Sequence, residues 1–211
     1  MCQICDESYL TTDSGNLNNE AYASWRKMLH PNGLPCSSIT ALDSVAASAA
    51  KGGHTRIVEA MIERGARNFE QIAYSAVWRG HRHIIYQMIE QGAQDFDGIA
   101  ITAAQKGHRD IVEAMIGKGS CRIGKIAEAA AKGGYRDIVD AMIERGAHNF
   151  EQIAQAAAGG GHREIVDSMI ERGARNFDWI SEAATRSGHR EIIDSIIERR
   201  AHPVMELTIP R

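Results

Sequence analysis

The sequence predicts an all-α protein, a helix-turn-helix repeat solenoid of six stacked repeats. Three observations predict this fold class. A residue pattern recurs every 27 positions through most of the 211-residue chain. Apolar residues inside the pattern fall at helical spacing. The chain has four prolines and none lies between residues 36 and 202, which suits helices, because proline interrupts them.

The period is clearest at a ring-bearing residue that follows a glycine. This position holds His54, His81, His108, Tyr135, His162 and His189. An Ile-Val or Ile-Ile pair and then a Met-Ile or Ile-Ile pair follow it in every copy. The copies occupy residues 40–201. A copy of this size cannot bury its apolar stripe alone, so the copies should stack on one another.

Each copy predicts two short helices, as the second copy illustrates. Asn68 is a good N-cap, and Gln71 stands three positions later, as in a capping box. Glu70 places negative charge in the first turn. Gly80 can adopt the left-handed conformation that ends this helix. The same N-cap place is held by Asp95, Asn149 and Asn176.

The second helix of that copy begins near His81 and ends at Gly92. Ile84, Ile85 and Met88 form its apolar face. Arg and Asp or Glu alternate on the outer side of the second helices, which predicts a solvated back with no patch of one charge. Alanines in the first helices allow close approach between copies.

Composition excludes several classes of protein. The formal charge is −3 and the pI about 6.3, whereas binders of nucleic acid or anionic membranes show a basic excess. No apolar stretch is long enough for a membrane helix. The N-terminus lacks the basic region of a secretory signal, and four cysteines do not make a disulfide scaffold. We expect a cytoplasmic monomer with no membrane or nucleic-acid partner.

The repeat unit A-A-x-x-G-H-x-x-I-V-x-x-M-I-x-x-G-A resembles the ankyrin repeat. It is seen from Ala103 to Gly119 and again from Ala157 to Ala174. The ankyrin unit has about 33 residues and opens with Thr-Pro-Leu-His; this unit is shorter and lacks that opening. We therefore expect an ankyrin-like stack without the β-hairpin finger. The chain also resembles the short ankyrin-type proteins of large DNA viruses, which implies host cytoplasm. The resemblance implies protein–protein binding and no enzymatic activity.

The periodic histidines allow two interpretations, a metal site or a structural turn. A reaction centre is used once, yet this histidine recurs in five copies. Stacked helices lie 8–10 Å apart, too far for neighbouring rings to share one ion at about 2.0–2.1 Å. Tyr135 keeps a ring and a polar atom but is no equivalent metal ligand. The sequence favours a ring that bonds backbone groups between copies.

Residues that vary between copies on the exposed stripe of the first helices are the predicted partner-binding set. Tyr and Trp are typical of binding hot spots, and Tyr74, Trp78 and Ile101 would form an exposed apolar cluster. The alternative is that these side chains pack against one another or under the N-terminal segment. The full set is Gln71, Tyr74, Ser75, Trp78, Ile101, Thr102, Gln105 and Trp179.

Residues 1–39 do not repeat and are predicted to cap the first copy, with a helix ending near Leu29. One zinc ion held by Cys2, Cys5, His30 and Cys36 is feasible, because C-x-x-C supplies half of a tetrahedral site; free thiols are the alternative. Residues 202–211 are a short cap or a tail. Cys121 is assigned no role.

The sequence therefore predicts a non-enzymatic scaffold that binds another protein on its concave first-helix face. The alternative is an adaptor or ubiquitin-ligase-like protein whose N-terminal segment binds zinc. An enzyme has little support, since no phosphate loop or nucleophile elbow occurs.

Overall fold

The protein is all-α in the computed structural model, which describes residues 39–201. This part of the chain contains helices and turns and no strand. The predicted helix-turn-helix repeat is confirmed. The helices pair as first and second helix of six repeats: α2 Ile39–Gly52 and α3 Thr55–Glu63; α4 Phe69–Val77 and α5 Arg82–Glu90; α6 Phe96–Lys106 and α7 Arg109–Gly117; α8 Ile123–Gly133 and α9 Arg136–Glu144; α10 Phe150–Gly160 and α11 Arg163–Glu171; α12 Phe177–Ser187 and α13 Arg190–Ala201.

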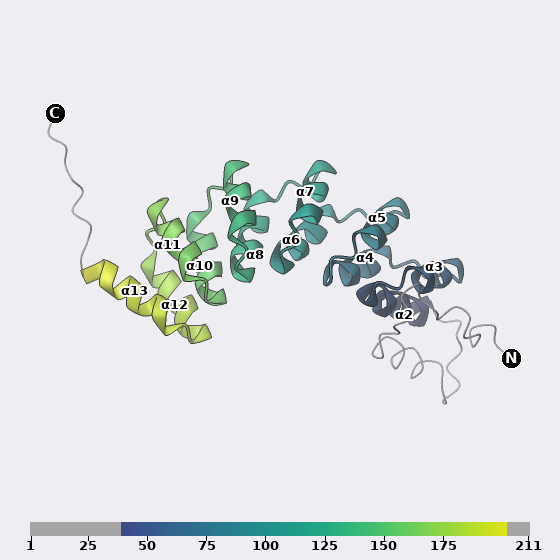
Figure 1. Cartoon of the computed structure of the whole chain (residues 1–211), viewed down its shortest axis with the longest axis horizontal. Coiled ribbons are helices and arrows are strands. Elements are labelled where there is room, and N and C mark those ends of the chain that lie inside the picture. The colour runs from purple at the N-terminus through teal and green to yellow at the C-terminus, as the bar shows by residue number, and fades with distance from the viewer. Residues whose placement is uncertain (1–38, 202–211) are drawn as a thin grey trace. The chain divides into compact units, whose positions relative to one another are not determined.

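The repeats divide into two units, each described by itself. Unit 1 spans Met1–Gly119 and contains α2 to α7, and unit 2 spans Ser120–Arg211 and contains α8 to α13. Within unit 1 the first helices α2, α4 and α6 form one row, and the second helices α3, α5 and α7 form another (Figure 1). Unit 2 repeats the two-row arrangement with α8, α10, α12 and their partners (Figure 1).

Small side chains let the first helices of successive repeats touch. Helix α4 packs on α2 and α6, and α10 packs on α8 and α12. The alanines at these contacts are fully buried: Ala73, Ala76, Ala100, Ala103, Ala127, Ala130, Ala154 and Ala157. The larger core residues come from both helices, for example Ile72 from α4 and Ile84 and Met88 from α5. Each such side chain contributes about 1.5–3 kcal/mol by burial.

The turn between the two helices of a repeat needs its glycine. In the second repeat Gly80 has φ of +71°, a left-handed conformation that glycine adopts without strain. Its amide donates to the Val77 carbonyl, and the His81 amide donates to Ala76. These two bonds satisfy carbonyls that the end of α4 leaves without helical partners.

The predicted N-caps form in three repeats and fail in one. The side-chain oxygens of Asn68, Asp95 and Asn176 each accept a hydrogen bond from the backbone amide three positions later. Asn149 occupies the same position without a cap bond. Its amide nitrogen instead donates to the Gly124 carbonyl at 3.3 Å and to Glu128 at 2.8 Å, so this cap prediction was wrong.

Acidic residues near the start of the first helices join neighbouring repeats. Oδ1 of Asp43 accepts hydrogen bonds from the backbone amides of Arg67 and Asn68, at 2.7 and 3.0 Å. Glu70 does the same for the amides of Gln94 and Asp95. Glu151 repeats the contact with Arg175 and Asn176. Gly124 holds the equivalent place in the fourth repeat and has no carboxylate, which is where the Asn149 cap fails.

Candidate functional site: the first-helix face

The first-helix face of unit 1 is the exposed side of α2, α4 and α6, and it carries one prominent aromatic residue. Trp78 caps the C-terminus of α4, and 53% of its surface is exposed. The hydrophobic core of the repeats consists of Ala, Ile, Val and Met, with one leucine, Leu42. A tryptophan left half exposed in such a scaffold is typical of a binding hot spot.

Two lysines from neighbouring repeats lie against this ring. Nζ of Lys106, the last residue of α6, is 3.7 Å from the centroid of the Trp78 ring. Nζ of Lys51 in α2 is 5.5 Å from it. Both distances are within the range of a cation–π interaction. Together with the exposed Arg79 and Gln105, these residues form what we call the Trp78 patch.

Tyr74, the other predicted aromatic of this face, is used within the fold. It is half-buried, and its hydroxyl donates a hydrogen bond to Asp95 in the next repeat. Burial first, then this bond and the negative charges of Asp95 and Glu70, raise the pKa of the Tyr74 phenol above its usual value. A Cβ at Gly98 would overlap the phenol, so glycine there makes room for it.

The remaining predicted residues of unit 1 divide by exposure. Gln71 and Gln105 are exposed, while Ser75, Ile101 and Thr102 are half-buried. The hydroxyls of Ser75 and Thr102 donate to carbonyls of their own helices. The expected exposed apolar cluster therefore reduces to Trp78, because the Tyr74 and Ile101 side chains are partly covered.

Trp179 belongs to unit 2 and is described with that unit. It lies in the first turn of α12 and is 46% exposed. Its backbone amide donates to the Asn176 cap at 3.2 Å. On the first helices of unit 2, Lys125 of α8 pairs with Glu128 at 2.8 Å, and Arg186 of α12 pairs with Glu182 at 2.7 Å.

The repeated glycine-histidine pair has a structural role between repeats. The imidazoles of His81, His108, His162 and His189 lie against the glycine of the preceding repeat, so that a Cβ at Gly53 would be 2.6 Å from Cε1 of His81. Gly161 stands in the same relation to His189. Nε2 of His162 lies 3.2 Å from the carbonyl oxygen of Lys132, which is the predicted contact of the ring with backbone between copies. Nε2 of His81 and of His108 is buried without a hydrogen-bond partner, so the predicted contact is not general.

Burial changes the titration of two of these rings. Burial lowers the pKa of His54 below its ordinary value. Burial also lowers the pKa of His81, with smaller contributions from His83, Arg79 and His54, while the Lys51 carbonyl acts in the opposite direction. The neutral imidazole is therefore the form that the packed turn favours. No group of three or more His, Cys, Asp or Glu side chains suited to a metal ion occurs within residues 39–201.

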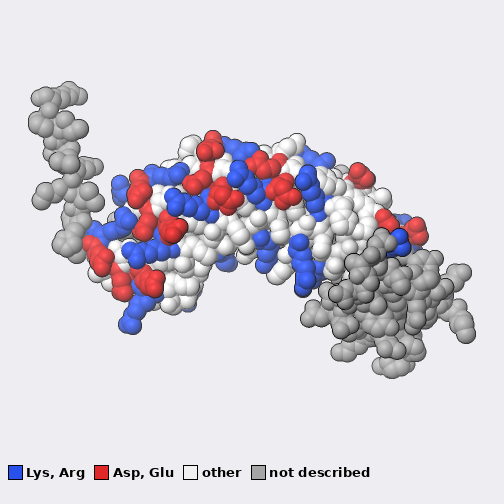
Figure 2. Space-filling view, in the orientation of Figure 1, with Lys and Arg blue, Asp and Glu red and all other residues white. Residues whose placement is uncertain are grey.

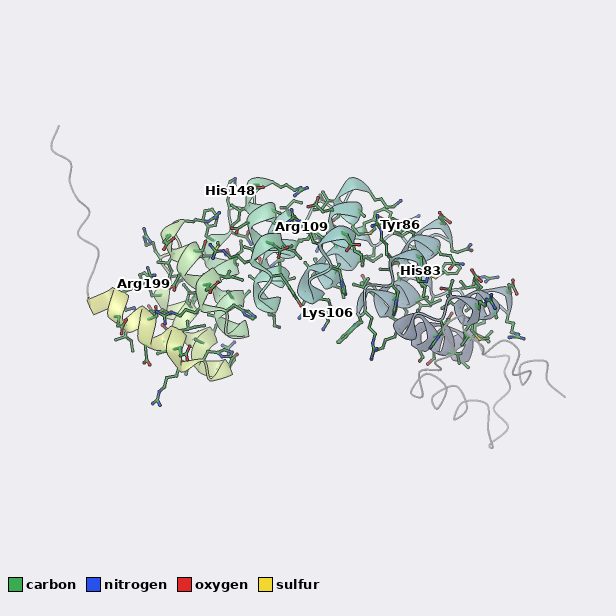
Figure 3. All side chains as sticks on the ribbon, viewed as in Figure 1. His83, Tyr86, Lys106, Arg109, His148 and Arg199 are labelled. Carbon is green, nitrogen blue, oxygen red and sulfur yellow. The ribbon has the colours of Figure 1, made fainter. Side chains whose placement is uncertain are left out.

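The second-helix side carries interspersed charges of both signs, as predicted (Figure 2). Arg136 and Arg163 pair with acidic residues one turn along their own helices. Arg172 and Arg199 reach back to Asp140 and Asp167 of the preceding repeat, at 2.9 and 3.0 Å. Figure 3 shows Tyr86 on this side of unit 1 and Lys106 on the opposite side.

A shallow cavity of about 430 Å³ lies in unit 2 where the repeat pattern breaks at Gly124. Its lining consists of Cys121, Arg122, Ile123, Gly124, Lys125, Glu128, Arg145, Gly146 and Asn149. Gly124, which lacks the carboxylate, and the displaced Asn149 both lie at this cavity. Sequence reasoning assigned Cys121 no role, and its place at this cavity came only from the structure.

The predicted zinc ligands Cys2, Cys5, His30 and Cys36, the capping helix and the C-terminal tail lie outside the described residues. The zinc site stays a prediction, and stoichiometric zinc in the purified full chain would be its test. No helix within residues 39–201 has the length and apolar character that crossing a bilayer requires.

Sequence reasoning missed the cations of the Trp78 patch. The available signal was the same 27-residue step, which places Lys51, Trp78 and Gln105 at one repeat position and Arg79 and Lys106 at the next. The cluster is not obvious from the sequence, because each copy places a different residue type at these two repeat positions.

Comparison with known proteins agrees with the fold. The ankyrin repeat domain of human ASB11 matches with a TM-score of 0.53 and 17% sequence identity, over 72% of this chain and 82% of that chain. No protein-family model and no curated protein matches the sequence. At this identity the likeness concerns the fold alone. The described chain thus folds as a helical repeat similar to an ankyrin repeat domain.

Proposed function

We propose that this protein is a non-enzymatic scaffold that binds a partner protein through its first-helix face. The single observation that carries the proposal is Trp78, half exposed on a stack of small-residue helices and flanked by lysines from the two neighbouring repeats. The ankyrin-like fold supports the same function class.

The packing of the repeats favours binding by a preformed surface. The backbone at both ends of α4 is held by caps, since Asn68 bonds the Gln71 amide and Gly80 closes the turn. The loop that precedes α4 is held to α2 by Asp43. A surface ordered before association loses little conformational entropy when a partner binds.

The test is affinity purification of the full chain from cells, with quantitative mass spectrometry. We expect Trp78→Ala to reduce capture of the specific partners roughly tenfold or more, because truncating a central aromatic removes a hot spot. Tyr86→Ala is the matched control. Tyr86 is an aromatic on the second-helix side with Arg82 and Lys118 beside its ring, and its replacement should leave capture unchanged.

Folding of the variants is checked separately. Because Trp78 is half exposed, its truncation should change the free energy of unfolding by less than about 0.5 kcal/mol. Equal capture by wild type and Trp78→Ala, at equal thermal stability, would contradict the proposed face. Trp179→Ala, measured in the same way, tells whether unit 2 contributes to the interface.

A further inference from the structure

We propose that the Trp78 patch binds an acidic segment of the partner protein. This inference rests on the proposed function, because it assigns a chemistry to the same face. Its basis is the distribution of charge in residues 39–119, where cations that form no ion pair with a described residue lie near one exposed aromatic side chain.

Among the described residues, the three cations of the patch have no anionic partner. Lys51, Arg79 and Lys106 form no ion pair within residues 39–201. The edge formed by α4 and α6 accordingly shows blue side chains without red ones beside them (Figure 2). Lys106 points outward along this edge (Figure 3). Because these cations are not engaged in ion pairs with described residues, they can bind carboxylates of a partner without breaking an existing pair.

The carboxylates of the same helices are occupied at the opposite ends. Asp43 and Glu70 lie near the N-termini of α2 and α4, and each binds two backbone amides of the following repeat. Asp43 precedes Lys51 by eight residues, roughly 12 Å along a helix at about 1.5 Å per residue. These groups therefore cannot neutralise the patch by direct contact.

The helix ends offset only part of the positive charge. Lys51, Arg79 and Lys106 lie at the C-terminal ends of α2, α4 and α6. Each helix C-terminus carries roughly half a negative charge. Three full positive charges against about three half charges leave the patch positive.

Many other cations of residues 39–201 are paired with carboxylates. On the second-helix side, arginines pair with acidic residues within and between repeats. In unit 2, Lys125 and Arg186 of the first helices pair with Glu128 and Glu182. Lys51, Arg79 and Lys106 are not paired in this way, and they lie near the most exposed aromatic side chain among the described residues of unit 1.

The geometry suits a segment that combines carboxylates with apolar side chains. The ammonium groups of Lys51 and Lys106 lie 5.5 and 3.7 Å from the Trp78 ring centroid, so one carboxylate near the ring can accept from either lysine. The indole then covers the apolar part of the bound segment. Charge-assisted hydrogen bonds of this kind are stronger than neutral ones.

The experiment selects peptides from a displayed random library on the full-length protein and measures their affinity by fluorescence polarisation. We expect the selected sequences to be rich in Asp and Glu. Charge reversal in Lys51→Glu/Lys106→Glu should weaken their binding roughly tenfold or more. Arg64→Glu/Lys118→Glu, the same charge change at the ends of α3 and α7, should alter it less than about twofold. Raising NaCl from about 50 to about 500 mM should weaken wild-type binding.

The outcomes separate this inference from the proposed function. Selected peptides that are neutral or basic but lose binding in Trp78→Ala would overturn the acidic assignment and leave the binding face intact. Peptides whose affinity is the same in Lys51→Glu/Lys106→Glu would also overturn the acidic assignment. Peptides indifferent to Trp78→Ala as well would overturn both.

A further variant tests the chain's own N-terminus as the occupant. Asp6, Glu7, Asp13 and Glu20 are acidic, and residues 1–20 contain no Lys or Arg. Acidic peptides should bind the wild type directly. Binding that emerges only after these four carboxylates are changed to Asn or Gln would identify an intramolecular occupant and overturn the assignment to a partner.

Discussion

At the scale of single residues, the stack is held by pairs of residues from neighbouring repeats. The glycine of one copy leaves space for the imidazole of the next, and its positive φ turns the chain between helices. Glycine is therefore required at this position for two reasons. It adopts the left-handed backbone conformation, and its lack of a side chain leaves room for the neighbouring imidazole. Gly188 ends the series, since a Cβ added there would meet no heavy atom within 4 Å beyond its immediate chain neighbours.

Gly161→Ala should destabilise the protein more than Gly188→Ala. Both glycines have a left-handed φ, +81° and +78°, so alanine costs about 1 kcal/mol or more at each. At Gly161 the added Cβ would also lie 2.6 Å from Cε1 of His189, which adds roughly 1 kcal/mol of overpacking. Chemical denaturation measures both losses.

A double-mutant cycle isolates the ring contact. In a His189→Ala background, the extra cost of Gly161→Ala should disappear. If Gly161→Ala cost the same with and without the imidazole, the spacing of glycine and histidine would have no packing role.

Acid should destabilise the fold through two half-buried histidines. Burial depresses the pKa of His54 and His81 in the folded state, while in the unfolded state it is near 6.5. The stability that they contribute is therefore complete above about pH 6.5 and is lost as the pH falls through the folded-state values. His81→Tyr copies the residue found at Tyr135 and should reduce the fall in melting temperature between about pH 7.5 and pH 5.

The control for this titration is His148→Tyr, which replaces an exposed imidazole. It should leave the pH dependence of the melting temperature as in the wild type. A His81→Tyr protein with an unchanged pH profile would show that protonation of His81 does not limit acid stability.

At the scale of helices, a repeat depends on contacts that its neighbours supply. The amides just before α4, α6 and α12 are bound by a carboxylate from the first helix of the preceding repeat. The fourth repeat lacks this carboxylate at Gly124, and the cap at Asn149 is lost with it. The absence of one side chain at Gly124 is thus accompanied by the loss of the inter-repeat carboxylate contact and of the N-cap of α10.

Gly124→Glu should restore the pattern and stabilise unit 2. Glycine inside a helix costs about 1 kcal/mol relative to good helix formers, and a restored N-cap adds about 1 kcal/mol. An added Cβ would lie 2.9 Å from Oδ1 of Asn149, so the Asn149 amide must rotate toward its cap position. Chemical denaturation should show the gain, and amide hydrogen exchange should show stronger protection at His148 and Asn149.

Gly124→Ala is the matched control, because it supplies the helix propensity without the carboxylate. We expect it to gain less stability than Gly124→Glu and to leave exchange at His148 and Asn149 unchanged. Equal gains from the two variants would show that the carboxylate contact contributes nothing.

At the scale of the whole molecule, stability is a sum over repeats and their interfaces. Each unit contains three repeats, the smallest number for which an inner repeat is covered on both sides. In unit 2 the inner helix α10 packs on both α8 and α12. Folding should therefore be possible for a unit, although not for one repeat.

A fragment of residues 120–211 should fold by itself into helices. The alanines and isoleucines of α10 are buried by neighbours within the same unit, so their burial survives the cut. We expect helical circular dichroism and a cooperative melt, at a lower temperature than the full chain. A fragment of residues 147–173, a single repeat, should be unfolded; a disordered spectrum for residues 120–211 would contradict the independence of the unit.

The sequence by itself determined the helices and their period, because both arise from local preferences. Alanine and isoleucine at helical spacing, N-caps such as Asn68 and the left-handed Gly80 act over a few residues and can be recognised in order along the chain. Repetition of the copies then implied stacking, since one apolar stripe needs another to cover it.

Tertiary structure decided which exposed residues are available to a partner. Tyr74 and Trp78 are equally plausible in the sequence, yet Tyr74 bonds Asp95 one repeat away and Trp78 stays half exposed between Lys51 and Lys106. Those contacts join residues more than twenty positions apart, and no local preference encodes them. Exposure and charge at the patch are therefore properties of the stack rather than of any single copy.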